Sequence, residues 1–469
     1  MRRAADVVVL GGGAAGLTAA LAARHAGADV VLVEAGQRLG GDCTFHGCVP
    51  SKALIEVAQV VHDARAAAAY GMIAGDVRVA FARVMAHRAG VVDAIAEDER
   101  DERFLSAGII VRRGAARLRS PSEIEVGGEV LRAERVVLAT GADPVVPAIP
   151  GLRGLPYLTN RTVFGLERLP ERLVVLGGGP TGLELAQAFR RLGSEVVVVE
   201  GGPRLLAASG PETGEAVRRL LEAEGIDVRL GAAALAADGR VGEIALRLAD
   251  GVSVRGDQLL VAVGRRAVLP AGADALGLRL ERGFVVVDER CRTSLPGVLA
   301  AGDVTGGVLA THVAAHEGSV AGRNAAGGRA RTDRRVVPSV VFLDPEVARV
   351  GLTEEEARRE RRQVVAVTFP MAGVDRARIA GRSQGFVKLV TAGRPLAGRL
   401  GGGELVGAEI VGYRAGELIH EAALAMRTRM FTGRLAQLIH AYPSASMAVQ
   451  QAALQLYPFG RALAGPEHL

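Results

Sequence analysis

Two stretches of the chain repeat one pattern of apolar and small residues. Residues 7–34 and 173–200 each begin with a short apolar run, pass through glycines and small residues, and end in a β-branched run closed by glutamate. Aligned without a gap, the stretches match at 16 of 28 positions. Short β-branched runs are typical of buried strands, and the longer small-residue stretch between them is typical of a helix. Each stretch therefore predicts a strand–helix–strand unit.

Each unit carries G-x-G-x-x-G where its first strand turns into its helix. The first glycine permits the tight turn, the second lets the backbone approach a pyrophosphate, and the third lets helix and strand pack closely. The helix N-terminus favours phosphate, and the closing carboxylate accepts hydrogen bonds from a ribose. One such motif also fits an ordinary glycine-rich turn, but two complete units indicate two bound dinucleotides. The residues are Gly11, Gly13, Gly16 and Glu34 in the first unit and Gly177, Gly179, Gly182 and Glu200 in the second.

The remaining pattern predicts further strands and a separate C-terminal part. The run 136–151 is a strand, a glycine turn and a proline-rich exit, and 259–266 ends the second unit in a similar way. The strand within 297–307 ends in Gly302-Asp303, which suits presentation of a carboxylate to a polar ligand. After a charged linker at 331–338, alternating runs predict antiparallel strands, followed by helices over 415–429 and 446–457. The charge run at 97–103 is predicted to be a solvated helix face.

Composition and charge exclude several classes of protein. With 49% apolar and 23% charged residues, the 469-residue chain is expected to fold into globular domains. Its net charge of +6 is carried by scattered arginines, and an aromatic content of 3% offers no stacking platform, so we expect no nucleic-acid binding. The uncharged residues 7–23 are similar to a signal peptide or a short membrane span, but glycines and alanines break them where a strand would become a helix. We expect no membrane association and a cytoplasmic location.

Two of the three cysteines lie five positions apart in GGDCTFHGCVPSK, residues 40–52. In a reducing compartment, such a pair is more often catalytic or metal-binding than structural. Cys48 precedes a helix expected to begin near Pro50, where backbone N–H groups and the helix dipole favour a thiolate. A zinc site would need two more soft ligands, and His46 is the one neighbour, so we predict no metal site; zinc and a structural disulfide remain the alternatives. Cys291 is expected to be a packing residue, with a third redox centre as the alternative.

Lysine is rare in this chain. Of its 57 basic residues only Lys52 and Lys388 are lysines. A compact ammonium can enter sites that a broad guanidinium cannot, so Lys52 is a candidate functional residue, although chance survival of a lysine also fits.

In its order of motifs the whole chain resembles the flavoprotein disulfide reductases, the family of dihydrolipoamide dehydrogenase, glutathione reductase and mercuric reductase. The motifs are the first dinucleotide unit, C-x4-C-x-P-S-K, A-T-G, the second unit, A-G-D and the C-terminal segment. The resemblance implies an α/β fold with two Rossmann-like dinucleotide-binding domains plus a C-terminal α+β interface domain. It also implies a homodimer whose active site uses both subunits. The expected boundaries are 1–150 and 271–335 for FAD binding, 151–270 for NAD(P) binding and 336–469 for the interface.

The resemblance also implies roles for individual residues. FAD would be held by the glycines of the first unit with Glu34, Gly141, Asp303 and the backbone of Ala116. The nicotinamide dinucleotide would be held by the second unit with Gly264 nearby. NADH is favoured over NADPH because Glu200 should repel a 2′-phosphate, although Arg204 could soften that preference and NADP remains possible. Cys43 and Cys48 would form a redox disulfide in which Cys48 faces the flavin and Cys43 attacks the substrate. Lys52 would approach the flavin N5 edge and pair with Glu184.

The chain departs from the family in one segment. Disulfide-reducing members have a segment like H-P-T-x-x-E, whose histidine is the general acid–base and whose glutamate orients it. Here the segment is HAYPSASM, with Tyr442 at the histidine position and Met447 at the glutamate position. A phenol is a poor proton acceptor at neutral pH. His440 lies nearby, but no carboxylate within 440–447 can orient it, and a histidine that makes a local hydrogen bond at a helix start is the alternative.

These features lead to a hypothesis about function. We predict an NADH-dependent FAD oxidoreductase that reduces the Cys43–Cys48 disulfide and passes electrons to an acceptor needing no thiol leaving group, a metal ion or a quinone. The resemblance to mercuric reductase is incomplete because the C-terminal cysteine pair of that enzyme is absent. The alternatives are a dihydrolipoamide dehydrogenase-like enzyme that uses Tyr442 or His440 as proton shuttle, and a non-catalytic FAD-binding subunit of a complex.

Overall fold

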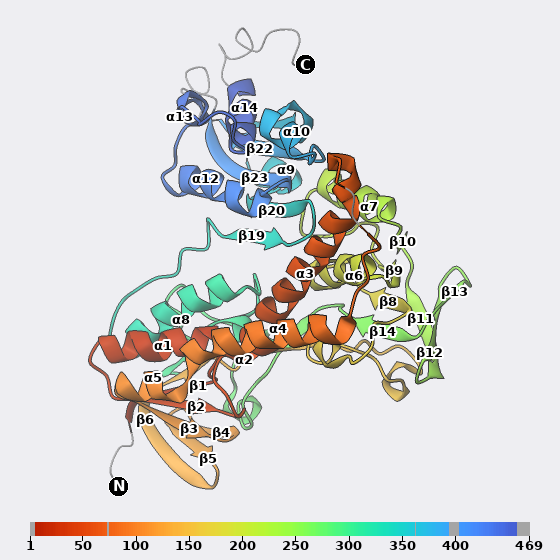
Figure 1. The fold of residues 1–469 in the computed structure, drawn as a ribbon. Helices are drawn as coiled ribbons and strands as arrows, with labels where there is room; N and C mark the ends of the chain where they lie inside the picture. The colour runs from red at the N-terminus through yellow and green to blue at the C-terminus, as the bar shows by residue number, and fades with distance from the viewer. Residues whose placement is uncertain (1–4, 73–74, 362, 394–402, 457–469) are drawn as a thin grey trace. The chain divides into compact units, whose positions relative to one another are not determined.

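The computed structural model describes residues 5–72, 75–361, 363–393 and 403–456 (Figure 1). The chain forms two compact units. Unit 1 consists of Met1–Pro170 and Gln258–Asp333, and unit 2 consists of Glu171–Asp257 and Arg334–Leu469. Among the described residues, none of the helices combines the length and the apolar character needed to cross a membrane.

A parallel sheet in the order β3-β2-β1-β6 forms the centre of unit 1, and β18 extends it by pairing with β6. Strands β1 and β2 are valine-rich and largely buried on both faces, as expected when helices cover a parallel sheet. The strands of unit 1 are β1 Ala5–Leu10, β2 Val30–Glu34, β3 Ile109–Arg113, β4 Ala116–Ser120, β5 Glu123–Val126, β6 Glu129–Leu138, β7 Ala142–Pro144, β14 Gln258–Val261, β15 Arg265–Ala267, β16 Leu280–Glu281, β17 Phe284–Val285 and β18 Val298–Ala300. The α-helices are α1 Ala14–His25, α2 Gly41–Phe45, α3 Cys48–Ala66, α4 Phe81–Ala96, α5 Asp101–Ser106 and α8 Thr311–Ala325.

Helices α1 and α8 run side by side in unit 1 (Figure 1). Glycines of α8 allow this contact: a Cβ added at Gly318 would lie 2.2 Å from the carbonyl oxygen of Ala15, and one at Gly322 would lie 2.1 Å from that of Ala19. Real Cβ atoms do not approach backbone so closely, so any side chain would force the helices apart. The position of α8 is therefore fixed against the first dinucleotide unit.

Unit 2 repeats the strand–helix–strand pattern and adds an antiparallel sheet. The parallel strands β10-β9-β8 are followed by an antiparallel meander, β11-β12-β13, and the C-terminal sheet has the order β19-β20-β23-β22-β21. The strands are β8 Arg172–Leu176, β9 Glu195–Val199, β10 Asp227–Arg229, β11 Ala234–Arg240, β12 Glu243–Leu248, β13 Ser253–Gly256, β19 Pro338–Val341, β20 Glu346–Gly351, β21 Val364–Pro370, β22 Phe386–Ala392 and β23 Glu404–Gly412. The α-helices are α6 Pro180–Leu192, α7 Pro211–Ala223, α9 Glu354–Glu360, α10 Asp375–Ile379, α12 Ala415–Arg427, α13 Thr432–Gln437 and α14 Met447–Gln455.

The C-terminal sheet and its helices enclose a separate apolar core, with α12 packed on β20 and β23 and α14 on β21 and β22. Lys388 of β22 is buried at the edge of this core and lies 2.8 Å from Glu212 of α7 and 2.6 Å from Glu354 of α9. Lys388 therefore joins β22 to α7 and α9 within unit 2. Loss of both carboxylates would leave a buried ammonium without a compensating charge.

The predicted α/β class and the strand–helix–strand units are confirmed, and the described part of the C-terminal pattern forms antiparallel strands and helices as expected. The predicted helix over 446–457 reaches Tyr457, which lies outside the described residues. One helix start was wrong: α3 begins at Cys48 rather than near Pro50. The Ser51 backbone N–H and hydroxyl both bond the carbonyl oxygen of Gly47, so the first helical turn includes the cysteine.

Candidate functional site

The two dinucleotide units have matching loop geometry. In unit 1 the carboxylate of Glu34 accepts hydrogen bonds from the backbone N–H groups of Gly12 and Gly36, both at 2.6 Å. In unit 2 Glu200 accepts from Gly178 and Gly202, again at 2.6 Å. The first glycine of each motif has a positive φ, +107° at Gly11 and +118° at Gly177, which L-residues rarely adopt. The duplication seen in the sequence is thus a duplication of structure.

We expect Glu200→Ala to weaken NADH use and to reduce discrimination against NADPH. The substitution removes an acceptor for ribose hydroxyls and a negative charge that repels a 2′-phosphate. The ratio of kcat/KM for NADH to that for NADPH should fall about tenfold or more, which corresponds to about 1.4 kcal/mol. Steady-state kinetics with both cofactors measures this ratio. Glu195→Ala, at an exposed position at the start of the strand that Glu200 follows, is the control; an unchanged ratio in Glu200→Ala would contradict the assignment.

The residues around Asp303 fit a bound FAD. Asp303 follows β18, and burial raises its pKa, while the nearby Arg265 guanidinium acts in the opposite direction. Arg265 Nε lies 3.7 Å from the Asp303 carboxylate, and this buried N–H has no hydrogen-bond acceptor among the described residues. A buried donor of this kind normally has a partner, so a ligand oxygen beside Asp303 would satisfy it. The backbone N–H groups at the start of α1, whose N-cap Gly13 provides no side-chain cap, offer a phosphate site.

The cysteine loop is fixed to unit 1 by polar contacts on both sides of Cys43. Asp42 accepts hydrogen bonds from Arg265 at 2.5 Å and from the Asn160 amide at 3.2 Å. On the other side, Thr44 donates to Glu99 at 2.7 Å. The run 97–103 was expected to be a solvated helix face, and Glu99 departs from this because it is half-buried where it accepts the Thr44 hydroxyl.

Cys43 lies within α2 and Cys48 is the first residue of α3, and both are free thiols. The hydrogen bond to Cys48 and burial raise the pKa of the Cys43 thiol above its usual range. Thr311, the first residue of α8, donates its hydroxyl to Cys43 Sγ at 3.0 Å and lies 3.4 Å from Cys48 Sγ. The structure thus brings the cysteine pair together, as predicted from the sequence. Among the described residues no group of three or more His, Cys, Asp or Glu side chains could hold a metal ion.

The other predicted site residues lie on several elements. Lys52 is the fifth residue of α3, and Glu184 is a buried residue of α6 that accepts a hydrogen bond from the Phe342 backbone N–H at 2.9 Å. Ala116 begins β4, and Gly141 and Gly264 occupy turns with φ of +74° and +136°. Their roles remain predictions. Cys291 is fully buried and its thiol lies 3.6 Å from the Glu317 carbonyl oxygen, in agreement with a packing residue.

In the segment 440–447 the phenol of Tyr442 is exposed, whereas the imidazole of His440 is buried. Tyr442 is 70% exposed and donates its hydroxyl to Asp375 at 3.1 Å, a contact that raises the pKa of the phenol. The His440 side chain is 5% exposed and lies before Tyr442 in the chain, several residues ahead of α14. The alternative interpretation placed His440 at the start of a helix, and this is wrong because α14 begins at Met447. The local hydrogen bond that this interpretation required is present: His440 Nδ1 lies 2.9 Å from the Leu438 carbonyl oxygen.

A carboxylate outside the segment orients His440. His440 Nε2 lies 2.9 Å from Glu421 on α12, so both ring nitrogens face oxygen acceptors. Burial raises the pKa of Glu421, and the contact with His440 acts in the opposite direction. The imidazole is therefore held between a backbone carbonyl oxygen and a half-buried carboxylate.

Sequence reasoning missed Thr311, Arg265, Glu99 and Glu421. Thr311 and Cys43 are 268 residues apart, and Arg265 and Asp42 are 223 apart, so no local spacing could indicate these contacts. The sequence did place two of these residues close to predicted site residues. Arg265 directly follows Gly264, and Thr311 follows the Gly302-Asp303 turn.

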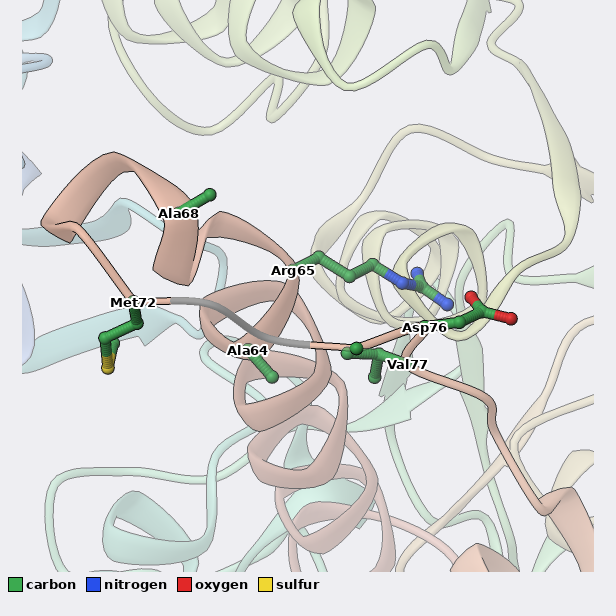
Figure 2. A pocket seen from close by; sticks show the side chains of 7 residues that line it. Ala64, Arg65, Ala68, Met72, Asp76 and Val77 are labelled. Atoms are coloured by element: carbon green, nitrogen blue, oxygen red, sulfur yellow. The ribbon is translucent and has the colours of Figure 1, made fainter.

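A separate hollow of about 560 Å³ lies at the far end of α3 and is lined by Ala64, Arg65, Ala68, Met72, Gly75, Asp76 and Val77 (Figure 2). Ala64 is 16 residues beyond Cys48, or roughly 24 Å along the helix at 1.5 Å per residue. The hollow is thus remote from the cysteine pair.

Comparison with known proteins adds family matches. The pyridine nucleotide-disulphide oxidoreductase family matches residues 5–318, and the dimerisation domain of that family matches residues 337–453. A dihydrolipoyl dehydrogenase of Thermus scotoductus is 38% identical over 96% of this chain and 97% of its own length. A mercuric reductase of Shigella flexneri is 37% identical over 94% of this chain and 78% of its own length.

Solved structures give the same picture. The Cu(II) complex of the HOCl-induced flavoprotein disulfide reductase RclA from Escherichia coli is 26% identical, with a TM-score of 0.83 over 97% of this chain and 99% of that one. LpdA from Mycobacterium tuberculosis is 28% identical, with a TM-score of 0.85 over 96% of this chain and 99% of that one.

Proposed function

Because the chain belongs to the pyridine nucleotide-disulphide oxidoreductase family, we propose that it transfers electrons from NADH through the Cys43–Cys48 pair to a soft metal ion, with a quinone as a related acceptor. The chain is a flavoprotein disulfide oxidoreductase, and members of its family use FAD and NAD(P)H. Its C-terminal part is a dimerisation domain, and we propose a cytoplasmic homodimer. Because its relatives are oxidoreductases, we do not propose a non-catalytic subunit.

Some of the site residues would hold the cofactors, and the cysteine pair would pass electrons to the acceptor. Bound FAD would accept the hydride of NADH and return the disulfide to two thiols. Glu34 and Asp303 would hold FAD, and Glu200 would hold the nicotinamide dinucleotide. The Cys43 thiolate would bind the metal ion, because the thiolate is the form of cysteine that ligates metals. Oxidation of the two thiols to one disulfide releases two electrons and two protons, which balances reduction of two Cu(II) to two Cu(I) or of one Hg(II) to Hg(0).

The observation that carries the proposal is the environment of Tyr442. The phenol stands where disulfide-reducing members have their histidine, and its bond to Asp375 keeps it protonated at neutral pH. It therefore cannot accept a proton as an imidazole would, and His440 is turned into the protein with both nitrogens engaged. A disulfide substrate leaves as a thiolate that must be protonated, whereas a metal ion accepts electrons without needing a proton. The similarity to a mercuric reductase and to a flavoprotein solved with Cu(II) supports this choice.

The His440–Glu421 pair favours a second candidate. An imidazole oriented by a carboxylate could pass a proton to a leaving thiolate, as a dihydrolipoamide dehydrogenase-like enzyme requires. This candidate needs His440 to reach the substrate.

The two candidates are separated by parallel assays of the FAD-loaded protein. NADH oxidation is followed without oxygen, with Cu(II) in the presence of a Cu(I)-specific chelator and, separately, with oxidised lipoamide. We expect a kcat/KM for Cu(II) at least about tenfold above that for lipoamide, a difference of about 1.4 kcal/mol in transition-state stabilisation. Rapid lipoamide reduction that collapses in His440→Ala, together with weak Cu(II) reduction, would overturn the proposal in favour of the second candidate.

A further inference from the structure

Arg204 is the one basic residue of the segment 201–210, which joins Glu200 to helix α7. Its Nη1 lies 3.5 Å from the carboxylate of Glu355 on helix α9, and its Nη2 donates to the Ala207 carbonyl oxygen at 3.3 Å. The guanidinium is thus engaged by a neighbouring helix and by its own segment, all within unit 2.

The backbone around Arg204 is anchored beside the second phosphate loop. The Gly202 N–H donates to the Glu200 carboxylate at 2.6 Å, and the Leu206 N–H donates to the Gly178 carbonyl oxygen at 3.0 Å. Arg204 lies between these two anchors in the chain. Its backbone is therefore held close to the carboxylate that we expect to bond the ribose.

An arginine at this place bears on the choice between NADH and NADPH. In dinucleotide-binding folds the carboxylate after the second strand bonds a ribose 2′-hydroxyl, and a nearby arginine accommodates a 2′-phosphate. A guanidinium binds phosphate through paired, charge-assisted hydrogen bonds. Arg204 would have to release Glu355 to make such bonds, so the carboxylate and a 2′-phosphate compete for the same N–H groups.

Helix α9 holds Glu355 in position. Glu355 is the second residue of this helix, and the first turn is closed by a capping box between Thr353 and Glu356. The residue before Glu355 is Glu354, which lies 2.6 Å from the buried Lys388 ammonium. The helix is therefore fixed to the C-terminal sheet, and the Glu355 carboxylate is available to Arg204.

The Arg204–Glu355 pair is partly exposed, with 32% of the arginine side chain and 52% of the glutamate side chain accessible. Pairs of this kind add little to the stability of a fold. Their charges nevertheless act on a ligand that arrives beside them, because a 2′-phosphate meets the carboxylates of Glu200 and Glu355 with only one guanidinium between them.

We propose that Glu355 is a positioning residue for dinucleotide specificity: it engages the Arg204 guanidinium, keeps it from a 2′-phosphate and so adds to the NADH preference set by Glu200. The inference rests on the proposed function in one respect, that the second unit binds the nicotinamide dinucleotide. It needs no electron acceptor and does not depend on the cysteine pair.

The test uses two adenosine probes that differ by the 2′-phosphate. Isothermal titration calorimetry measures the Kd of adenosine 2′,5′-bisphosphate and of adenosine 5′-monophosphate, at low ionic strength because salt screens exposed charges. FAD-loaded protein is used, so that the first unit is occupied and the probes report on the second. We expect Glu355→Gln to tighten binding of the bisphosphate relative to the monophosphate by about threefold, the effect of losing one partly exposed ion pair. Glu355→Asp, which keeps the charge, should leave the ratio near that of the wild type.

Two controls separate this effect from a general change of charge. Glu360→Gln removes the same charge from the last residue of α9 and should leave the ratio of the two Kd values unchanged. In an Arg204→Ala background, Glu355→Gln should no longer change the ratio, because the guanidinium through which Glu355 acts is absent.

Each contrary result has a distinct meaning. An unchanged ratio in Glu355→Gln would overturn the inference, as would an equal change with and without Arg204. A wild-type protein that binds neither probe would overturn the nicotinamide site of the proposed function and this inference with it. Failure of Cu(II) reduction alone would overturn the proposed acceptor and leave this result intact.

Discussion

Substituting either Cys43 or Cys48 by serine should halve the number of NADH molecules that the FAD-loaded protein consumes without oxygen. One disulfide and one FAD each accept two electrons, so the wild-type chain should consume two NADH and each variant one. With the electron path to the acceptor cut, the rate of Cu(II) reduction should fall about a thousandfold or more, a loss of about 4 kcal/mol in transition-state stabilisation. An anaerobic NADH titration followed by absorbance counts the electrons.

Cys291→Ala is the matched control for this titration. Cys291 is the third cysteine, it is fully buried, and its thiol faces a backbone carbonyl oxygen, so its loss should leave the two equivalents unchanged. A wild-type protein that accepts only one equivalent would mean that the cysteine pair takes no part. The acceptor should then be sought among groups that are reduced by the flavin itself, such as quinones.

Gly16→Ala should cost the protein about 3 kcal/mol or more in the free energy of unfolding, and the protein should lose its FAD. A Cβ at this position would lie 1.7 Å from the carbonyl oxygen of Gly11, on the backbone of the same phosphate loop. The clash can be relieved only if helix α1 moves away from β1, which would disturb the N–H groups that we propose bind phosphate. Thermal unfolding and the absorbance ratio of flavin to protein report the two effects.

Gly90→Ala provides the comparison. Gly90 lies inside helix α4 with no atom within 4 Å of an added Cβ, so alanine should be neutral or stabilising by up to about 1 kcal/mol because it has the higher helix propensity. If Gly16→Ala keeps its FAD and unfolds at the wild-type temperature, the close approach of helix and loop is not required for binding.

The features that could be predicted from the sequence are those whose contacts are local. The hydrogen bonds from Gly12 to Glu34 and from Gly178 to Glu200 each span 22 residues, and the first glycine of each motif has a positive φ. The cysteine pair lies within one loop and was found for the same reason.

The features that could not be predicted depend on tertiary structure. Glu421 reaches His440 from helix α12, so inspection of 440–447 alone could not find the carboxylate that orients the imidazole. The charge pattern at 97–103 gave no sign that Glu99 would hold Thr44, because a charged run looks the same whether or not one member turns inward. Thr311 belongs to none of the sequence motifs, and its contact with Cys43 exists only because the fold brings the start of α8 to the cysteine loop.

The bonds from Glu34 and Glu200 to their own loops bear on the thermodynamics of cofactor exchange. Each carboxylate already fastens two backbone N–H groups, so both loops have their binding shape before a ribose arrives. Little conformational entropy is then lost when a dinucleotide docks, and little is regained when it leaves. For a nicotinamide that must be replaced in every catalytic cycle, a preorganised loop permits fast exchange without a folding step. The same preorganisation in the first unit would make the proposed FAD site ready in the newly folded chain.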